Sequence, residues 1–294
     1  TGTIKLTFPP AAKGSPQEQL WTIRLNAEQL DLDNYFPPAK PEDSGKPRST
    51  TPWDLSPLQG LNLDAQIKLK RTRLRKLAMQ DMLVSAALQR NRFTFAFQVD
   101  KMYDGSGVFL AQGSLDPGAG RVTLNTANLQ VKSIHLGKAL ADIFADDSNS
   151  YGGTASLAVI ASGSMGCERE IFSGMSGTWN VGIKDGIYPA FIGSETAGLR
   201  NTFSNASASG VLDKGIVRWD DFKLTGTMVD MNGDGVINMG DRVMDFTIYV
   251  TLARVPTVPV RFQGSFAAPS MSLRGAQMVV HTARGAGTTV FDIF

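Results

Sequence analysis

Apolar and polar residues alternate with a period of two along much of this chain, and this pattern limits the possible folds more than any other feature. Successive side chains of a β-strand point to opposite faces, so each alternating run predicts a strand with one apolar face. Polar residues interleave the apolar ones, as is typical of antiparallel sheets with one solvated face. The clearest runs are Ile4 to Phe8, Trp21 to Leu25, Leu61 to Leu69, Phe93 to Val99, Met244 to Leu252 and Val258 to Phe262.

Glycine and proline interrupt the chain too often for long helices. There are 30 Gly and 14 Pro in 294 residues, and several form turn signals between alternating runs. These signals are Asp104-Gly105, Asp116-Pro117-Gly118, Asp185-Gly186 and Asp213-Lys214-Gly215. Helical spacing occurs around Leu136, Leu140, Ile143 and Phe144, with a second short helix expected near residues 196–203.

We therefore predict a mainly β fold, an extended and strongly curved antiparallel sheet with one or two short helices. The pattern leaves open whether the sheet is groove-like or sandwich-like. Residues 37–57 are rich in Pro, Ser and Thr and predict a loop or linker. Because alternation lies on both sides, we favour an insertion between N-terminal strands in residues 1–36 and a larger β domain in residues 58–294. We interpret both ends as cuts through a longer protein.

Composition and motifs argue against nucleic-acid binding and against enzymatic activity. The charge balance, 29 Lys+Arg against 27 Asp+Glu, is too even for a nucleic-acid-binding surface. A single Cys167 excludes an intrachain disulfide and any multi-cysteine zinc site, and we expect His135 and His281 to be surface or capping residues. The sequence has no Gly-x-Ser-x-Gly, Walker or His-Glu-x-x-His motif, so we predict no enzymatic activity.

A basic run covers residues 68–76, with Lys68, Lys70, Arg71, Arg73, Arg75 and Lys76. A solvated strand face and turn is the favoured interpretation. The alternative is attraction to anionic lipid head groups, because the run adjoins apolar alternation.

Residues 230–241 read DMNGDGVINMGD and match the spacing of a calcium-binding loop. Oxygen ligands fall at loop positions 1, 3, 5, 7, 9 and 12, and Gly235 occupies position 6, where a sharp turn is needed. We predict a Ca²⁺ site in a hairpin loop here, although the flanks predict strands rather than the helices of an EF-hand. The alternative is a polar hairpin without metal. The predicted ligands are Asp230, Asn232, Asp234, the backbone carbonyl of Val236, Asn238 and Asp241.

The order of several segments resembles the C-terminal periplasmic region of the AsmA family of bacterial envelope proteins. Residues 30–38, LDLDNYFPP, are similar to a family segment that precedes a variable Pro-rich stretch. Tyr103-Asp104-Gly105, the short helix leading into Tyr151-Gly152-Gly153, and residues 258–269 follow in the family's order. The resemblance covers roughly residues 26–274, whereas the acidic motif at 230–241 is not a usual family feature.

This resemblance implies a function in the bacterial envelope. Family members are anchored in the inner membrane by a helix, which this chain lacks, and extend into the periplasm as a β-sheet implicated in phospholipid transfer or outer-membrane assembly. Envelope partners beyond the lipid are unknown. An alternative of another class is a calcium-stabilised structural or adhesive β module. If a lipid lane exists, it should be lined by one parity of the long strands, with candidates Phe93, Phe95, Phe97, Val99, Phe246, Ile248, Val250 and Phe262.

Overall fold

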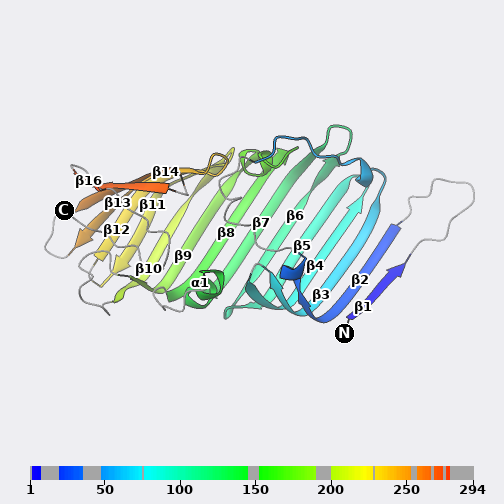
Figure 1. Cartoon of the computed structure of the whole chain (residues 1–294), viewed down its shortest axis with the longest axis horizontal. Helices are drawn as coiled ribbons and strands as arrows, with labels where there is room; N and C mark the ends of the chain where they lie inside the picture. The colour runs from blue at the N-terminus through cyan, green and yellow to red at the C-terminus, as the bar shows by residue number, and fades with distance from the viewer. Residues whose placement is uncertain are drawn as a thin grey trace, which may run out of the picture.

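The chain folds into one 16-stranded sheet whose strands follow one another in sequence order from β1 to β16 (Figure 1). The computed structural model describes residues 2–7, 20–35, 48–74, 76–144, 152–189, 200–227, 229–252, 257–265, 268–273 and 276–278. The strands are β1 (Gly2–Thr7), β2 (Leu20–Asp31), β3 (Asn62–Leu74), β4 (Leu77–Gln89), β5 (Arg92–Met102), β6 (Gly105–Asp116), β7 (Arg121–His135), β8 (Gly152–Met165), β9 (Met175–Pro189), β10 (Arg200–Asp213), β11 (Ile216–Gly226), β12 (Val229–Asn238), β13 (Val243–Leu252), β14 (Val258–Ser265), β15 (Ala268–Leu273) and β16 (Ala276–Met278). The prediction of a curved, mainly β fold is confirmed, and a single sheet takes the place of a sandwich in the described residues.

All neighbouring strands pair antiparallel except β2 and β3, which are parallel. A parallel pair needs a connection that returns to the starting edge of the sheet. Part of this connection is visible as the short 3₁₀ helices η1 (Leu32–Asn34) and η3 (Ser56–Leu58), which lie at opposite edges. The strands on both sides of the Pro-rich segment therefore belong to one sheet, whereas residues 36–47 lie outside the described part.

Two-residue turns connect several of the hairpins, and their backbone conformation fits the twist of the strands. Arg90-Asn91 and Tyr103-Asp104 have positive φ at both positions, with 49° and 62° in the first turn and 48° and 69° in the second. This is the type I′ pattern favoured in tight hairpins. Lys214-Gly215 forms the same kind of turn, as Asp213-Lys214-Gly215 predicts, between β10 and β11.

Irregular strand pairing recurs near the ends of β3 to β8 that adjoin α1. Leu69 and Met82 pair and are buried, and so are Thr72 and Met79 three residues away on each strand, so both strands change the parity of their inward residues without a register shift. Asp81, between these pairs, has a φ of 54°. Register shifts occur nearby, in β5 between Val99 and Met102 and in β7 between Val131 and Ile134. Bulges bend strands and increase their twist, so these irregularities curl this edge of the sheet.

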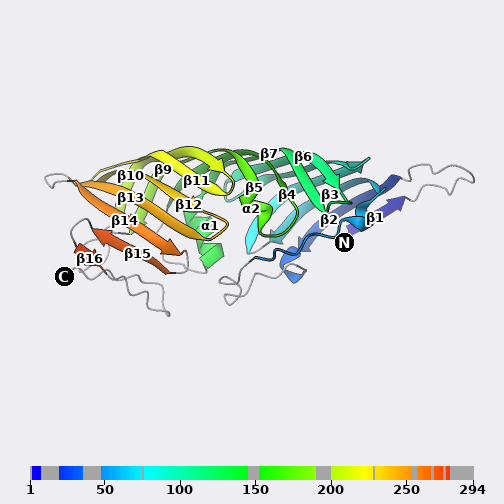
Figure 2. The same cartoon turned by 90° about the horizontal axis from the view of Figure 1, so that it is seen from above.

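The sheet is bowed, and its two ends bend toward the side on which α1 (Leu136–Phe144) lies (Figure 2). The predicted helix around Leu136 and Leu140 is thus confirmed. The second predicted helix is wrong for residues 200–203, which belong to β10, while 196–199 lie outside the described residues. Asp185-Gly186, expected to be a turn, is instead a bulge within β9, where Asp185 has a φ of 51°.

Candidate functional site

One face of the sheet is apolar from end to end, and we call it the apolar face. Strand pairing brings one apolar or glycine residue of each strand into a single row across β2 to β15. Fourteen strands spaced about 4.8 Å apart give this row a length of roughly 60 Å. The row is Leu25, Ile67, Val84, Phe97, Phe109, Leu129, Val159, Trp179, Gly210, Trp219, Gly235, Phe246, Phe262 and Met271.

No charged residue interrupts the apolar face in the described parts of β2 to β15 when the pairing is followed strand by strand. The side chain of Thr72 on this face is hydrogen-bonded, because its hydroxyl donates to the Leu30 carbonyl oxygen at 2.7 Å. The opposite, outer face carries the charges, such as the Arg261 guanidinium paired with the Asp245 carboxylate at 2.7 and 2.8 Å. This ion pair lowers the pKa of the Asp245 carboxyl. The charged side chains of these described strands therefore lie on the outer face, which also exposes apolar residues such as Leu110 and Ile160.

All eight residues proposed from the sequence as lipid-lining lie on the apolar face. Phe93, Phe95, Phe97 and Val99 line it from β5, and Phe246, Ile248, Val250 and Phe262 line it from β13 and β14. Their sequence neighbours Thr94 and Thr247 pair on the outer face, with Gln112 and Arg261 respectively. The structure thus brings the candidates onto one surface; it does not test whether lipid contacts them.

The part of the apolar face formed by β9 to β14 contains an aromatic series, of which sequence reasoning named Phe246 and Phe262 and missed Trp179 and Trp219. Trp179, Trp219, Phe246 and Phe262 follow one another with ring centroids 6.2, 5.8 and 4.8 Å apart, the last pair stacked. Glycines lie between them in the row, because Gly210 pairs with both tryptophans and Gly235 pairs with Trp219 and Phe246. The sequence pattern that could have identified Trp179 was the alternation of Met175, Trp179 and Val181 in β9.

Glycine is required at these positions because the rings lean over its backbone. A Cβ on Gly235 would lie 2.1 Å from the Phe246 Cβ and 2.9 Å from the Trp219 Cζ2. A Cβ on Gly186 would lie 1.8 Å from the Phe203 Cζ. Aromatic rings packed over strand glycines stabilise such sites by covering backbone that would otherwise be exposed. The side chains of Trp219 and Phe203 therefore occupy the space that a larger residue than glycine would need.

The apolar face is most deeply buried beside the irregular pairing in β3 to β5. Leu69 and Val99 are 2% and 1% exposed, and Leu32 of η1 packs against their cluster. The blue turn η1 lies on the inner side of the bowed sheet in Figure 2, so the apolar face is the concave one. Phe95, Trp179 and Phe246, farther from η1, remain only partly buried. These parts of the apolar face are therefore partly exposed.

Helix α1 is fastened to the β5–β6 turn by two side-chain contacts. The Tyr103 hydroxyl donates to Asp142 Oδ2 at 2.7 Å and accepts from the Ala78 amide, and Lys138 Nζ donates to Asp104 Oδ2 at 2.5 Å. Burial and the bond to Asp142 raise the pKa of Tyr103 to about 12. His135 Nδ1 accepts from the Lys138 amide at 3.4 Å, which agrees with the capping role expected of it. These contacts fix α1 at one edge of the apolar face.

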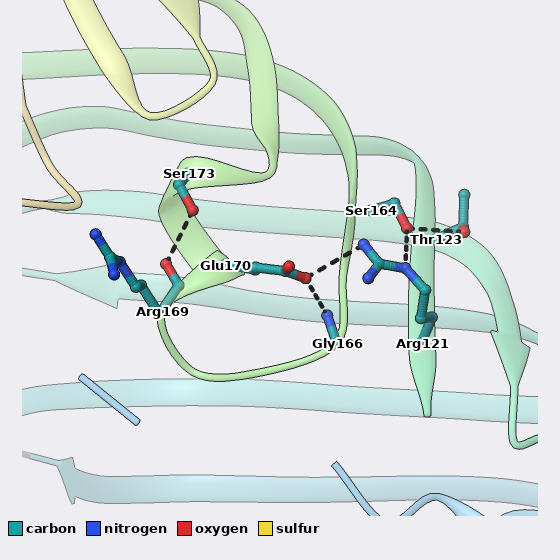
Figure 3. Close-up of polar contacts among 7 residues, drawn as sticks. All are labelled: Arg121, Thr123, Ser164, Gly166, Arg169, Glu170 and Ser173. Carbon is teal, nitrogen blue, oxygen red and sulfur yellow. Dashed lines mark hydrogen bonds and ion pairs between the residues drawn. The ribbon is translucent and has the colours of Figure 1, made fainter. Parts of the chain in front are cut away.

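At the opposite edge, polar contacts hold the β8–β9 connection (Figure 3). Glu170, in the short helix α2 (Glu170–Ser173), accepts from the Gly166 amide at 2.7 Å and pairs with Arg121 at 3.2 Å. Residues 48–61 lie along this edge, where the Trp53 amide donates to the Gly166 carbonyl and the Arg169 amide to the Ser49 carbonyl. These contacts tie turns of distant strands together. The network stabilises this edge of the sheet.

The predicted calcium loop is a strand. Residues 229–238 form β12, paired along both sides with β11 and β13, and only residues 239–242 turn. Alternate strand residues lie roughly 6.8 Å apart, whereas calcium ligands lie about 2.3–2.6 Å from the ion. The six predicted ligands, Asp230, Asn232, Asp234, Val236, Asn238 and Asp241, therefore do not surround one point, and the loop conformation was wrong.

The end of this segment is held by protein contacts. Asn238 Nδ2 donates to Asp241 Oδ2 at 2.8 Å, and Arg169 lies 3.6 Å from the Asp241 carboxylate. In the described ranges no cluster of three His, Cys, Asp or Glu side chains forms a metal site. Calcium binding itself is not tested by these contacts and stays a prediction.

The basic run points mostly to solvent. Lys68, Lys70, Arg71 and Arg73 are exposed, and Lys70 pairs with Glu28 at 3.2 Å. The arrangement agrees with the solvated strand face favoured from the sequence.

The fold and the apolar face define the architectural class of this chain, a long bowed single sheet with a charge-free concave face. No family model matches the chain, and no curated protein sequence matches it. No helix in the described residues is long and apolar enough to span a membrane.

Proposed function

We propose that this chain is a periplasmic segment of an AsmA-like envelope protein and that its apolar face holds the acyl chains of phospholipids during transfer or outer-membrane assembly. The observation that carries the proposal is the apolar row that crosses β2 to β15 without a charged residue. The order of sequence segments that resembles the AsmA family supports the location. In this proposal the full-length protein is anchored in the inner membrane.

The physical argument is that an accessible apolar surface of this size needs an apolar partner. Soluble monomers rarely expose contiguous apolar patches larger than a few hundred Å². Each methylene group moved from water onto such a surface contributes about 0.8 kcal/mol. Acyl chains can cover the whole length of the apolar face while the charged head groups of the lipids stay in water. The proposal requires no catalytic residue, so we propose that the chain is not an enzyme.

The first experiment is mass spectrometry of lipids extracted from the natively purified chain. We expect copurified phospholipid and its transfer between liposomes by the full-length protein. Absence of both would overturn the proposal.

The second experiment places a photocrosslinking residue at matched positions on the two faces. Crosslinks to phospholipid are expected from Phe95 and Ile248 and not from their neighbours Thr94 and Thr247, which pair on the outer face. Equal labelling of both pairs would contradict the assignment of lipid to the apolar face.

A calcium-stabilised structural or adhesive module is the second candidate. It depends on the acidic spacing at 230–241, and the strand conformation of β12 does not favour it. Calcium titration, described below, separates it from the first proposal.

A further inference from the structure

The methionines of this chain are concentrated on the apolar face. In the described strands, each methionine with a described side chain pairs within that face, and none occurs on the outer face. These residues are Met79, Met82, Met102, Met165, Met175, Met231, Met244 and Met271. Methionine is flexible and polarisable, so it adapts an apolar surface to ligands of different shape. Its thioether sulfur is also chemically reactive.

Burial divides the eight methionines into two groups. Met79, Met82 and Met165 are only 4%, 4% and 6% exposed. The other five are partly exposed. Met271 pairs with Phe262 of the aromatic series, Met244 lies two residues from Phe246 on β13, and Met231 packs against Phe203 and Ala206. The partly exposed group is Met102, Met175, Met231, Met244 and Met271. An oxidant in solution therefore reaches the second group before the first.

We propose that these five methionines are oxidation sites and that their conversion to the sulfoxide reduces the affinity of the apolar face for acyl chains. The oxidant is a hydroperoxide, either hydrogen peroxide or an oxidised lipid. The thioether sulfur attacks the terminal, protonated peroxide oxygen, an S–O bond forms as the O–O bond breaks, and the proton moves to the leaving oxygen. The sulfur is oxidised by two electrons, and the peroxide is reduced to water or an alcohol. Methionine sulfoxide is reversible by reductases, so the change is a switch rather than only damage.

The effect on binding follows from the scarcity of hydrogen-bond donors on the apolar face. A sulfoxide oxygen is a strong hydrogen-bond acceptor, whereas the Thr72 hydroxyl already donates to Leu30 and the unpartnered Trp179 Nε1–H can serve at most one of the five sites. Burying an unpaired polar group under an acyl chain is unfavourable. Full oxidation of the five sites is expected to weaken lipid retention by about tenfold or more. The second part of this inference rests on the proposed lipid-binding function.

The test treats the purified chain with graded hydrogen peroxide and maps sulfoxides by peptide mass spectrometry, with and without phosphatidylethanolamine–phosphatidylglycerol liposomes. We expect oxidation first at the five partly exposed sites, slower oxidation when liposomes are present, and loss of retained phospholipid in parallel. Oxidation at Met79, Met82 and Met165 at the same rate would overturn the assignment of sites.

The control is a variant in which all five sites are changed from Met to Leu, a substitution that nearly conserves volume. Whatever amount of phospholipid this variant retains before peroxide treatment, it should retain the same amount after it. Loss of retention in this variant after peroxide would assign the effect to another group, such as Cys167, and overturn the inference. If the untreated chain retains no lipid, the proposed function and the effect on affinity both fail, while the oxidation map still decides the sites.

Discussion

The packing of Phe203 over Gly186 gives the sharpest test of how the apolar face is built. A Cβ on Gly186 would lie 1.8, 2.2 and 2.4 Å from three atoms of the Phe203 ring. Ordinary contact begins near 3.4 Å, so the ring must retreat by about 1.6 Å, the difference between 3.4 and 1.8 Å. Phe203 is only 8% exposed and packs with Ala206 and Ile183, which leaves little room for that movement. We expect Gly186→Ala to lower the free energy of unfolding by about 1–3 kcal/mol.

Thermal unfolding followed by circular dichroism measures this effect. At roughly 2–4 °C per kcal/mol, Gly186→Ala should lower the Tm by about 2–12 °C. The matched control is Gly182→Ala, also in β9, where a Cβ meets nothing within 4 Å. It should leave the Tm unchanged or raise it slightly, because alanine reduces the entropy of the unfolded chain.

A double-mutant cycle identifies the cause. Phe203→Ala alone should cost about 3–5 kcal/mol. If the ring is the obstacle, adding Gly186→Ala to Phe203→Ala should cost at least about 1 kcal/mol less than it does alone. Additive costs, or equal losses from Gly186→Ala and Gly182→Ala, would refute the packing argument.

Three further predictions follow from the described contacts. The folded-state pKa of Tyr103 is raised to about 12 from an ordinary value of 10, so its stabilising contribution is full below pH 10 and lost as pH rises to about 12. The free energy of unfolding measured with urea should therefore fall between pH 10 and 12, and it should fall less in Tyr103→Phe than in the unchanged chain. Equal falls in the two proteins would show that the Tyr103 phenol is not responsible. Asn91 has a φ of 62° in the β4–β5 turn, so Asn91→Gly should raise the free energy of unfolding by about 0.5–1 kcal/mol. A lower Tm for Asn91→Gly would contradict this turn geometry. If the calcium prediction from residues 230–241 is correct, millimolar Ca²⁺ should raise the Tm, EDTA should lower it, and Asp234→Ala should abolish both effects; an unchanged Tm in all three conditions would leave β12 an ordinary strand.

The sequence by itself determined which residues share a surface within each strand. Period-two alternation is a local property of extended backbone, so it placed Phe95 with Phe97 and Ile248 with Val250 before any pairing was known. The helix at Leu136–Phe144 and the turn at Asp213-Lys214-Gly215 were equally local signals. Phe246 and Phe262 belong to different strands, and alternation alone could not make them stacked neighbours.

The tertiary structure decided how the strands combine. The parallel pairing of β2 with β3 depends on a connection whose path no local pattern describes. The inward parity changes from Leu69 to Thr72 although the sequence continues without a break, because β3 and β4 change together.

The acidic segment at residues 230–241 shows most directly why the sequence alone did not determine how the strands combine. Asn232-Gly233-Asp234-Gly235 has the composition of a turn, and from sequence its glycines indicate a sharp bend. In the sheet, Gly235 is needed because Phe246 and Trp219 occupy the space of its missing side chain. Glycine permits both a tight turn and close contact with a neighbouring strand, and only the residues brought beside it by the fold determine which of these it serves.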